Sequence, residues 1–201
     1  MVADISNSGY LPFLLDGNID INQEAANKGG TTIIRPWHNR KPVMPGTFLI
    51  YRDCKEVGNM KRRLRVYKKT AGICMDVVKN FTGVKPILGI CLGHQCIGEA
   101  LGRTVSYAKA LFHGKQSVIE HDGTSIFTGI DSPIKVARYH SLAVRQEDLP
   151  ECLKVLARTR DSEIMAIRHK EYPVVGLQFH PESIYTEHGK RIIENFVNGT
   201  M

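Results

Sequence analysis

The chain has 201 residues, 42% of them hydrophobic, and a formal net charge of +7 at pH 7. This length suffices to bury one substantial core, so we expect a single domain over residues 1–201. No apolar run approaches a membrane span and the N-terminus lacks the apolar segment of a secretory signal, so the sequence argues against a membrane protein and a secreted one.

The basic charge is concentrated in residues 1–69. This segment holds 12 Lys and Arg against 6 Asp and Glu, whereas residues 70–201 hold 15 against 14. Stretches such as 9–13 and 36–42 show neither alternation nor helical periodicity, which makes the segment atypical and a candidate for poor folding. Clustered Lys and Arg can bind phosphates, but no nucleic-acid motif accompanies them, so we expect no nucleic-acid partner.

From residue 70 onward the apolar pattern predicts alternating helices and strands. The expected helices are Gly72–Phe81, Gly93–Leu101 and Thr186–Asn198, the last with Ile192, Ile193, Phe196 and Val197 on its inner face. The expected strands are Pro86–Ile90, Gly102–Tyr107, Lys115–His121, Ile134–Arg138, Leu153–Thr159, Ile164–His169 and Val174–Phe179. This succession predicts an α/β fold with a mostly parallel central sheet flanked by helices.

The most informative stretch is Gly89-Ile90-Cys91-Leu92-Gly93, which follows an apolar strand and opens a helix. A cysteine with a glycine two residues away on each side is typical of the tight strand-to-helix turn that presents a nucleophile, because the glycines let strand and helix approach closely. The helix N-terminus would point N–H groups and its positive end at the sulfur and favour the thiolate. A buried structural cysteine is the alternative.

A cysteine nucleophile needs a base, and the base needs a group that orients it. His180 follows the expected strand Val174–Phe179, and Glu182 lies two residues further on. Because residues two apart in an extended segment point to the same side, the Glu182 carboxylate can lie beside the His180 imidazole. A His-x-Glu pair alone is weak evidence, but with the cysteine turn it indicates a Cys-His-Glu triad.

Four blocks of the sequence together resemble the class I (triad) glutamine amidotransferases. They are Gly89 to Leu101, His113-Gly114-Lys115, Arg138 to Leu142 and Gly176 to Ser183. Their order and spacing are similar to those of the glutaminase subunits of anthranilate synthase (component II) and aminodeoxychorismate synthase. The resemblance covers about residues 70–201 and implies the flavodoxin-like α/β fold of that family, but it does not include residues 1–69.

The resemblance implies a reaction and the residues that carry it out. Cys91 would attack the side-chain amide of L-glutamine, His180 would carry the proton to the departing ammonia, and Glu182 would hold the productive tautomer of His180. Hydrolysis of the resulting thioester would then release glutamate. Two oxyanions would form in turn and need stabilisation.

The resemblance also implies the residues that bind the substrate. Gln95 would contact the glutamine, Ser141 and Leu142 would bind its amino-acid end through the backbone, and the backbone N–H of Leu92 would be one oxyanion donor. Without the resemblance, Gln95 would be read as a solvated helix residue and Ser141-Leu142 as an ordinary turn into a strand.

Three further histidines lie near these blocks, and we assign none of them to catalysis. His94 stands at the helix start and is expected to face away from the sulfur. His140 is expected to support the shape of the loop that carries Ser141. By resemblance, His113 faces the partner synthase.

By the same resemblance the chain is one component of a heteromeric enzyme. The family passes ammonia through a channel to a chorismate-using synthase large subunit, which makes anthranilate for tryptophan or aminodeoxychorismate for folate. The shared motifs leave the pathway open. A GMP-synthase or carbamoyl-phosphate-synthase glutaminase is the enzymatic alternative, and the block Arg138 to Leu142 argues against it.

The cysteine content agrees with a cytoplasmic location. The five cysteines are odd in number and show no CxxC spacing, so neither disulfides nor zinc sites are expected. The resemblance implies no metal and no other cofactor.

The chain departs from the family upstream of residue 70. The family has a first buried strand and, shortly before the segment matching Ala71-Gly72-Ile73, a Pro-Gly-Pro-Gly loop that supplies the second oxyanion N–H. Arg62–Lys69 occupies that place and contains no glycine, and Met44-Pro45-Gly46-Thr47 lies too far upstream. The alternative function is therefore a non-catalytic or defective subunit that lacks the oxyanion loop. An N-terminal segment translated out of frame would explain such a departure.

Overall fold

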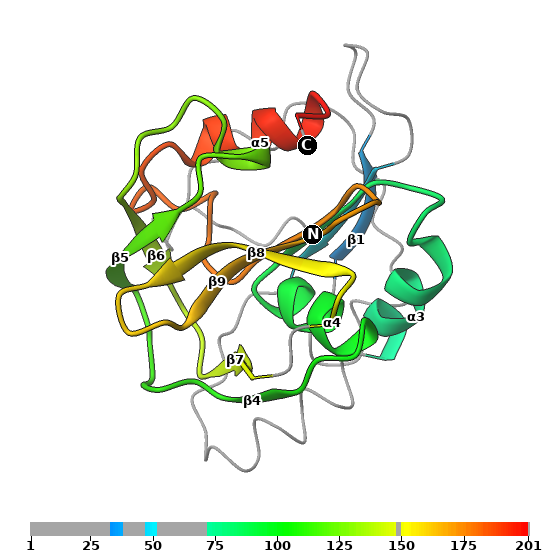
Figure 1. The fold of residues 1–201 in the computed structure, drawn as a ribbon, viewed down its shortest axis with the longest axis horizontal. Coiled ribbons are helices and arrows are strands. Elements are labelled where there is room, and N and C mark those ends of the chain that lie inside the picture. Colours follow the sequence, from blue (N-terminus) through cyan, green and yellow to red (C-terminus); the bar gives the residue numbers. More distant parts are fainter. Residues whose placement is uncertain (1–32, 38–46, 52–71, 148–149, 201) are drawn as a thin grey trace, which may run out of the picture.

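A computed structural model of the chain describes residues 33–37, 47–51, 72–147 and 150–200. In this part of the chain, one large sheet lies between two groups of helices (Figure 1). The helices and strands expected after residue 70 are all present, within a few residues of the expected bounds. The predicted α/β class is therefore confirmed.

The described strands form one large sheet and one small one. Those of the large sheet are β1 (Ile33–Trp37), β2 (Thr47–Tyr51), β3 (Ile87–Ile90), β5 (Lys115–His121), β6 (Ile134–Arg138), β8 (Leu153–Thr159), β9 (Ile164–His169) and β10 (Val174–Leu177). Their spatial order is β1-β2-β3-β10-β9-β8-β5-β6. The small sheet is an antiparallel pair of β4 (Val105–Tyr107) and β7 (Leu142–Val144).

The parallel part of the large sheet comprises β2, β3 and β10, and the candidate site lies there. β3 pairs in parallel with β2 on one side and with β10 on the other. The neighbouring strands on both flanks pair antiparallel among the described residues. β8, β9 and β10 follow one another through short turns, and such turns permit only antiparallel pairing.

Helices cover both faces of the large sheet, each over its own hydrophobic core. One face carries α3 (Gly72–Phe81) and α4 (Leu92–Ala100), and the other carries α5 (Gly189–Val197) and the 3-10 helix η2 (Ser125–Phe127) (Figure 1). On the inner face of α5, Ile192, Ile193 and Phe196 are buried and Val197 is partly buried, as the spacing predicted.

Two strands lie within residues 1–69, where the sequence pattern predicted none. β2 pairs with β3 from Phe48 beside Ile87 to Ile50 beside Gly89, and β1 pairs with β2. The β2 sequence Thr-Phe-Leu-Ile-Tyr is nearly continuous in apolar character, so it carries no alternating signal. Arg62–Lys69 and Met44–Gly46, considered above for an oxyanion loop, lie outside the described residues.

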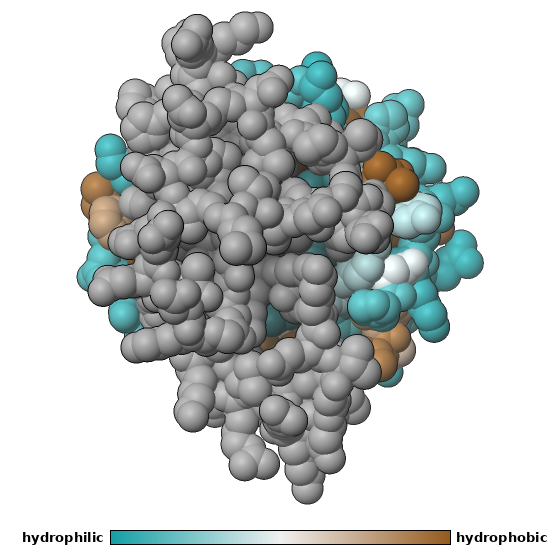
Figure 2. Space-filling view, turned by 180° about the vertical axis from the view of Figure 1, so that it is seen from behind, coloured by the Kyte–Doolittle hydropathy of each residue, from teal (hydrophilic) through white to brown (hydrophobic). Residues whose placement is uncertain are grey.

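The visible outer surface of the described residues is mostly polar. In Figure 2 the hydrophobic colour on these residues occurs in separate small patches among hydrophilic side chains. Within the described ranges, no helix has the length and apolar character needed to cross a membrane.

Candidate active site

Cys91 occupies the junction between β3 and α4, as the glycine spacing predicted. Its N–H donates to the Leu177 carbonyl (2.8 Å), and its own carbonyl accepts the Gln95 N–H (3.2 Å). Between these bonds its backbone has φ 53° and ψ −99°, a left-handed conformation that side chains other than glycine rarely adopt. The strand and the helix thus hold a strained turn at a fully buried cysteine.

Glycines at this junction allow the helix to lie directly against the sheet. A Cβ on Gly89 of β3 would lie 2.5 Å from the carbonyl carbon of Gly93 in α4. A Cβ on Gly176 of β10 would lie 2.9 Å from Nδ1 of His94. Neither distance is tolerated by a side chain, so the position of α4 over β3 and β10 depends on these two residues.

His180 and Glu182 follow β10 and form the contact expected of a base and its orienting group. His180 Nδ1 lies 2.7 Å from Glu182 Oε1, and both side chains are buried. The ring of Tyr139 packs edge-on against His180, with the centroids 5.2 Å apart. A carboxylate accepts hydrogen bonds, so Nδ1 carries the proton and Nε2 is the basic nitrogen of the neutral ring.

Cys91 follows β3, and the His180 and Glu182 pair follows β10, so both parts of the expected triad lie at the same edge of neighbouring parallel strands. β3 ends at Ile90, which is paired with Leu177 at the end of β10, so Cys91 and Gln178 are the next residues on each strand. Gln178 Nε2 lies 3.8 Å from the Cys91 sulfur. The carboxyl ends of parallel strands are the usual place for ligand sites in α/β folds.

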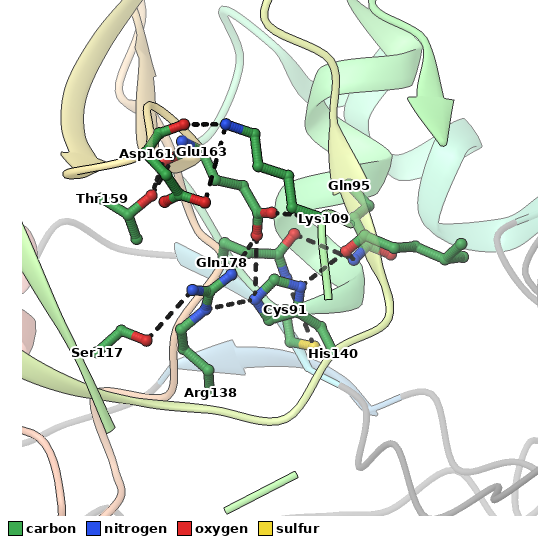
Figure 3. A network of polar contacts seen from close by, with 11 residues as sticks. Cys91, Gln95, Lys109, Ser117, Arg138, His140, Thr159, Asp161, Glu163 and Gln178 are labelled. Atoms are coloured by element: carbon green, nitrogen blue, oxygen red, sulfur yellow. Dashed lines mark hydrogen bonds and ion pairs between the residues drawn. The ribbon is translucent and has the colours of Figure 1, made fainter. Parts of the chain in front are cut away.

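Gln95 is buried and anchored, so the reading of this residue as a solvated helix position is wrong. Its Nε2 donates to the Leu142 carbonyl (2.9 Å) and to Gln178 Oε1 (3.1 Å). These contacts bring α4, β7 and the end of β10 together beside Cys91, as Figure 3 shows. Ser141 and Leu142 are buried as well. Ser141 lies in the bend before β7 and Leu142 begins that strand, so the two residues do form a turn into a strand.

Leu92, the expected oxyanion donor, is the first residue of α4. The N–H groups of the first helical turn have no carbonyl partner within their own helix, so they can bind an anion. The assignment of Leu92 as an oxyanion donor stays a prediction.

His94 fills the space between α4 and β10. Its side chain is fully buried against Gly176. Burial lowers the pKa of His94 to about 4, so the ring is neutral at physiological pH. This placement accounts for the buried imidazole without a catalytic role.

A buried ion pair, not anticipated from the sequence, lies behind the Ser141 loop. Arg138 at the end of β6 pairs with Glu163, which directly precedes β9. The Arg138 Nε donates to His140 Nε2 (3.0 Å), and His140 Nδ1 lies 2.9 Å from the Leu142 carbonyl. Burial and the charge of Arg138 lower the pKa of His140 well below its ordinary value, which keeps the ring neutral.

Glu163 and Gln178 are the site residues that sequence reasoning missed. Glu163 stands alone before a strand, and no spacing connects it with Arg138. Gln178 lies inside the segment Gly176 to Ser183 that carries the resemblance, so its position two residues before His180 was the available signal. In the part of the chain that the structure describes, no group of three His, Cys, Asp or Glu side chains is placed to hold a metal ion.

Comparison with known proteins places these features in a family. Residues 64–199 match the family model for Glutamine amidotransferase class-I. The chain is 54% identical over 128 residues to the Bifunctional protein TrpGD of Thermotoga maritima, a match that covers 64% of this chain and 22% of that protein. It is 52% identical over 127 residues to the Aminodeoxychorismate/anthranilate synthase component 2 of Bacillus subtilis, covering 63% of this chain and 66% of that protein.

Two further comparisons agree with this. The chain is 48% identical over 132 residues to the Anthranilate synthase component 2 of Pseudomonas aeruginosa, with coverage of 63% and 66%. It is similar in structure to a putative GMP synthase protein from Thermoplasma acidophilum, with a TM-score of 0.60 and 28% identity over 70% of this chain and 66% of that one. The chain thus spans less than two thirds of the length of these relatives. With the family model covering more than half of its residues, the chain belongs to the class-I glutamine amidotransferases.

Proposed function

We propose that this chain is a glutaminase subunit that hydrolyses L-glutamine to glutamate and ammonia. The observation that carries the proposal is the left-handed turn at Cys91, whose sulfur lies at the same sheet edge as the His180 and Glu182 pair. A strained, buried cysteine at a helix start beside a carboxylate-bound imidazole has the parts of a nucleophile and its base.

The proposed reaction proceeds in two halves. His180 Nε2 takes the proton of the Cys91 thiol, and the thiolate attacks the amide carbon of glutamine to form a tetrahedral oxyanion. His180 then gives that proton to the amide nitrogen, the C–N bond breaks, and ammonia leaves as the thioester forms. In the second half, His180 takes a proton from water, which attacks the thioester through another oxyanion. Glutamate leaves and the thiol is restored. Glu182 keeps the proton on His180 Nδ1 through both halves.

The surroundings of the sulfur support the first step. The Gln178 Nε2 group donates toward the Cys91 sulfur, and the first turn of α4 points its N–H groups toward the same place. Both favour negative charge on the sulfur over the neutral thiol. The Leu92 N–H is the oxyanion donor that we assign.

The substrate would lie between α4 and the loop before β7. In this proposal Gln95 contacts the glutamine, and the backbone of Ser141 and Leu142 holds its amino-acid end. The buried, hydrogen-bonded state of Gln95 and Leu142 supports this, because a preformed site loses little entropy when it binds a small ligand.

The partner is a chorismate-using synthase large subunit that receives the ammonia. The printed names of the relatives, anthranilate synthase component 2 and aminodeoxychorismate/anthranilate synthase component 2, support this part of the proposal. They leave both anthranilate and aminodeoxychorismate as the product. A heteromer in the cytoplasm follows from the same proposal.

A subunit that does not hydrolyse glutamine is the second candidate. The observation that favours it is the absence of glycine in Arg62–Lys69, where the family has its Pro-Gly-Pro-Gly loop. A chain of this kind would bind the synthase without releasing glutamate.

Release of glutamate from glutamine separates the two candidates. The wild-type chain should produce glutamate when a chorismate-using large subunit is present, and the variant Cys91→Ser should produce none. The matched control is Cys152→Ser, at a half-buried cysteine just before β8, which should keep the wild-type rate. No glutamate from the wild-type chain with its partner would support the non-catalytic candidate.

A further inference from the structure

A continuous chain of buried polar contacts leads from the residue before β9 to the nucleophile, as Figure 3 shows. It starts at Glu163, passes through Arg138 and His140, and reaches the Leu142 carbonyl. From that carbonyl the Gln95 and Gln178 side chains continue it to the Cys91 sulfur.

Arg138 sets the direction of every hydrogen bond between Glu163 and the Leu142 carbonyl. A guanidinium group has donors and no acceptor, so the His140 Nε2 that faces it must accept. The proton of the neutral ring is then on Nδ1, which donates to the Leu142 carbonyl at 2.9 Å. The opposite tautomer would place two donors face to face at Nε2 and two acceptors face to face at Nδ1.

The Leu142 carbonyl joins the contacts from Glu163 to the contacts that lead on to Cys91. It accepts one hydrogen bond from His140 and another from Gln95 Nε2. Two donors from different elements fix the orientation of this peptide group more firmly than either would alone. The Gln95 amide is fixed in turn, and with it the amide of Gln178.

We propose that Arg138, His140 and Glu163 act together as positioning residues for glutamine hydrolysis: they fix the Leu142 peptide group and, through it, the Gln95 and Gln178 amides that face substrate and sulfur. This inference rests on the proposed glutaminase function. It assigns these three residues an effect on glutamine binding through their neighbours, without contact to the reacting atoms.

The positioning residues are themselves held from outside by the segment 108–112. The Arg138 Cζ lies over the Phe112 ring, 3.3 Å from its centroid, and the Phe112 ring stacks on the His140 ring with centroids 5.5 Å apart. The Lys109 N–H donates to Glu163 Oε2 (3.0 Å), and the Phe112 N–H donates to the His140 carbonyl (3.0 Å). These contacts, together with its two hydrogen bonds, fix the orientation of the His140 imidazole.

Two variants of His140 separate positioning from packing. His140→Phe keeps an aromatic ring against Phe112 but removes both hydrogen bonds. His140→Asn keeps a short amide donor near the place of Nδ1. We expect His140→Phe to raise KM for glutamine about 10-fold or more with a smaller change in kcat, and His140→Asn to recover much of that loss.

The matched control is His169, another buried histidine and the last residue of β9. Its Nδ1 accepts the N–H groups of Glu171 and Tyr172, both at 3.1 Å, and its ring packs on Tyr172. His169→Phe should lower the free energy of unfolding and leave KM unchanged. An equal rise of KM in His169→Phe and His140→Phe, or no rise in His140→Phe, would overturn the inference while the glutaminase function stood.

The tautomer of His140 gives a readout that does not depend on activity. The nitrogen chemical shifts of the ring in the wild-type chain should report a proton on Nδ1 and none on Nε2 at neutral pH. A proton on Nε2 would contradict the inference even if the chain hydrolysed no glutamine.

Discussion

Glu182 takes no part in the bond-making steps of the proposed reaction, but its charge acts on His180. Its carboxylate lies 2.7 Å from His180 Nδ1 and is buried, so the imidazole has a fixed proton position and a partner for the charge that it gains during the reaction. An amide of the same shape at this position would offer neither the charge nor a unique orientation.

The variant Glu182→Gln should therefore lose most of its glutaminase activity. We expect kcat to fall about 10²- to 10⁴-fold with little change in KM, because base strength is affected and glutamine contacts are not. Steady-state kinetics with the synthase partner would measure this. The control is Glu194→Gln on the exposed side of α5, and a kcat for Glu182→Gln equal to that of this control would contradict the assignment.

Single residues also mark the limit of prediction from sequence. Cys91, His180 and Glu182 stand in patterns a few residues long, so local spacing suffices to identify them. Glu163 and Gln178 contribute through contacts across long sequence separations, and no local pattern contains the partner. Such residues become visible only when the fold brings β6, β9 and β10 together.

At the scale of elements, the site depends on how closely α4 lies against β3. Gly89 permits this approach, since a Cβ there would meet the Gly93 carbonyl group at 2.5 to 2.6 Å. Backbone atoms cannot move aside as a flexible side chain can. The helix would have to shift, and Cys91 at its first turn would shift with it.

We expect Gly89→Ala to lower the free energy of unfolding by about 1–3 kcal/mol or more and to reduce glutamine hydrolysis in the folded protein. Urea denaturation and the glutamate assay would measure the two effects. The comparison variant is Gly123→Ala, where a Cβ meets open space and only the positive φ is unfavourable, so its hydrolysis rate should be that of the wild type. Equal rates for both variants would show that the contact between α4 and β3 does not position Cys91.

Elements with a clear apolar period were predictable from sequence, and the rest were not. α3, β5, β6, β8 and β9 have the bounds that the pattern gave. β7 covers only Leu142 to Val144, and η2 only Ser125 to Phe127, both too short for a periodic signal. β2 was missed because its nearly continuous apolar sequence shows no alternation, and β1 because it is defined by its pairing with β2.

At the scale of the whole molecule, the two cores bury imidazoles together with apolar side chains. His94 is fully buried between α4 and β10, and its pKa of about 4 lies below the ordinary value of 6.5. Between these values the unfolded chain binds a proton that the folded chain does not. The contribution of neutral His94 to the free energy of unfolding is therefore complete above pH 6.5 and is lost as the pH drops toward 4. The lowered pKa of His140 acts in the same direction.

The free energy of unfolding should fall by about 2 kcal/mol between pH 7 and pH 5 through His94 alone. Urea denaturation at several pH values would measure this in the wild-type chain and in His94→Gln, which cannot titrate. The variant should be less stable at pH 7 and should lose less stability on acidification. Identical losses in the two proteins would mean that His94 is not kept neutral by burial.

The account as a whole depends on Cys91 being a nucleophile in a glutamine-binding site. The most direct measurement is covalent trapping with a glutamine analogue that carries a chloroketone in place of the side-chain amide, followed by mass spectrometry of the peptides. We expect the label on Cys91, protection by L-glutamine, and slower labelling in His180→Asn. Labelling spread over the other cysteines, or labelling of Cys91 that glutamine does not slow, would contradict the account.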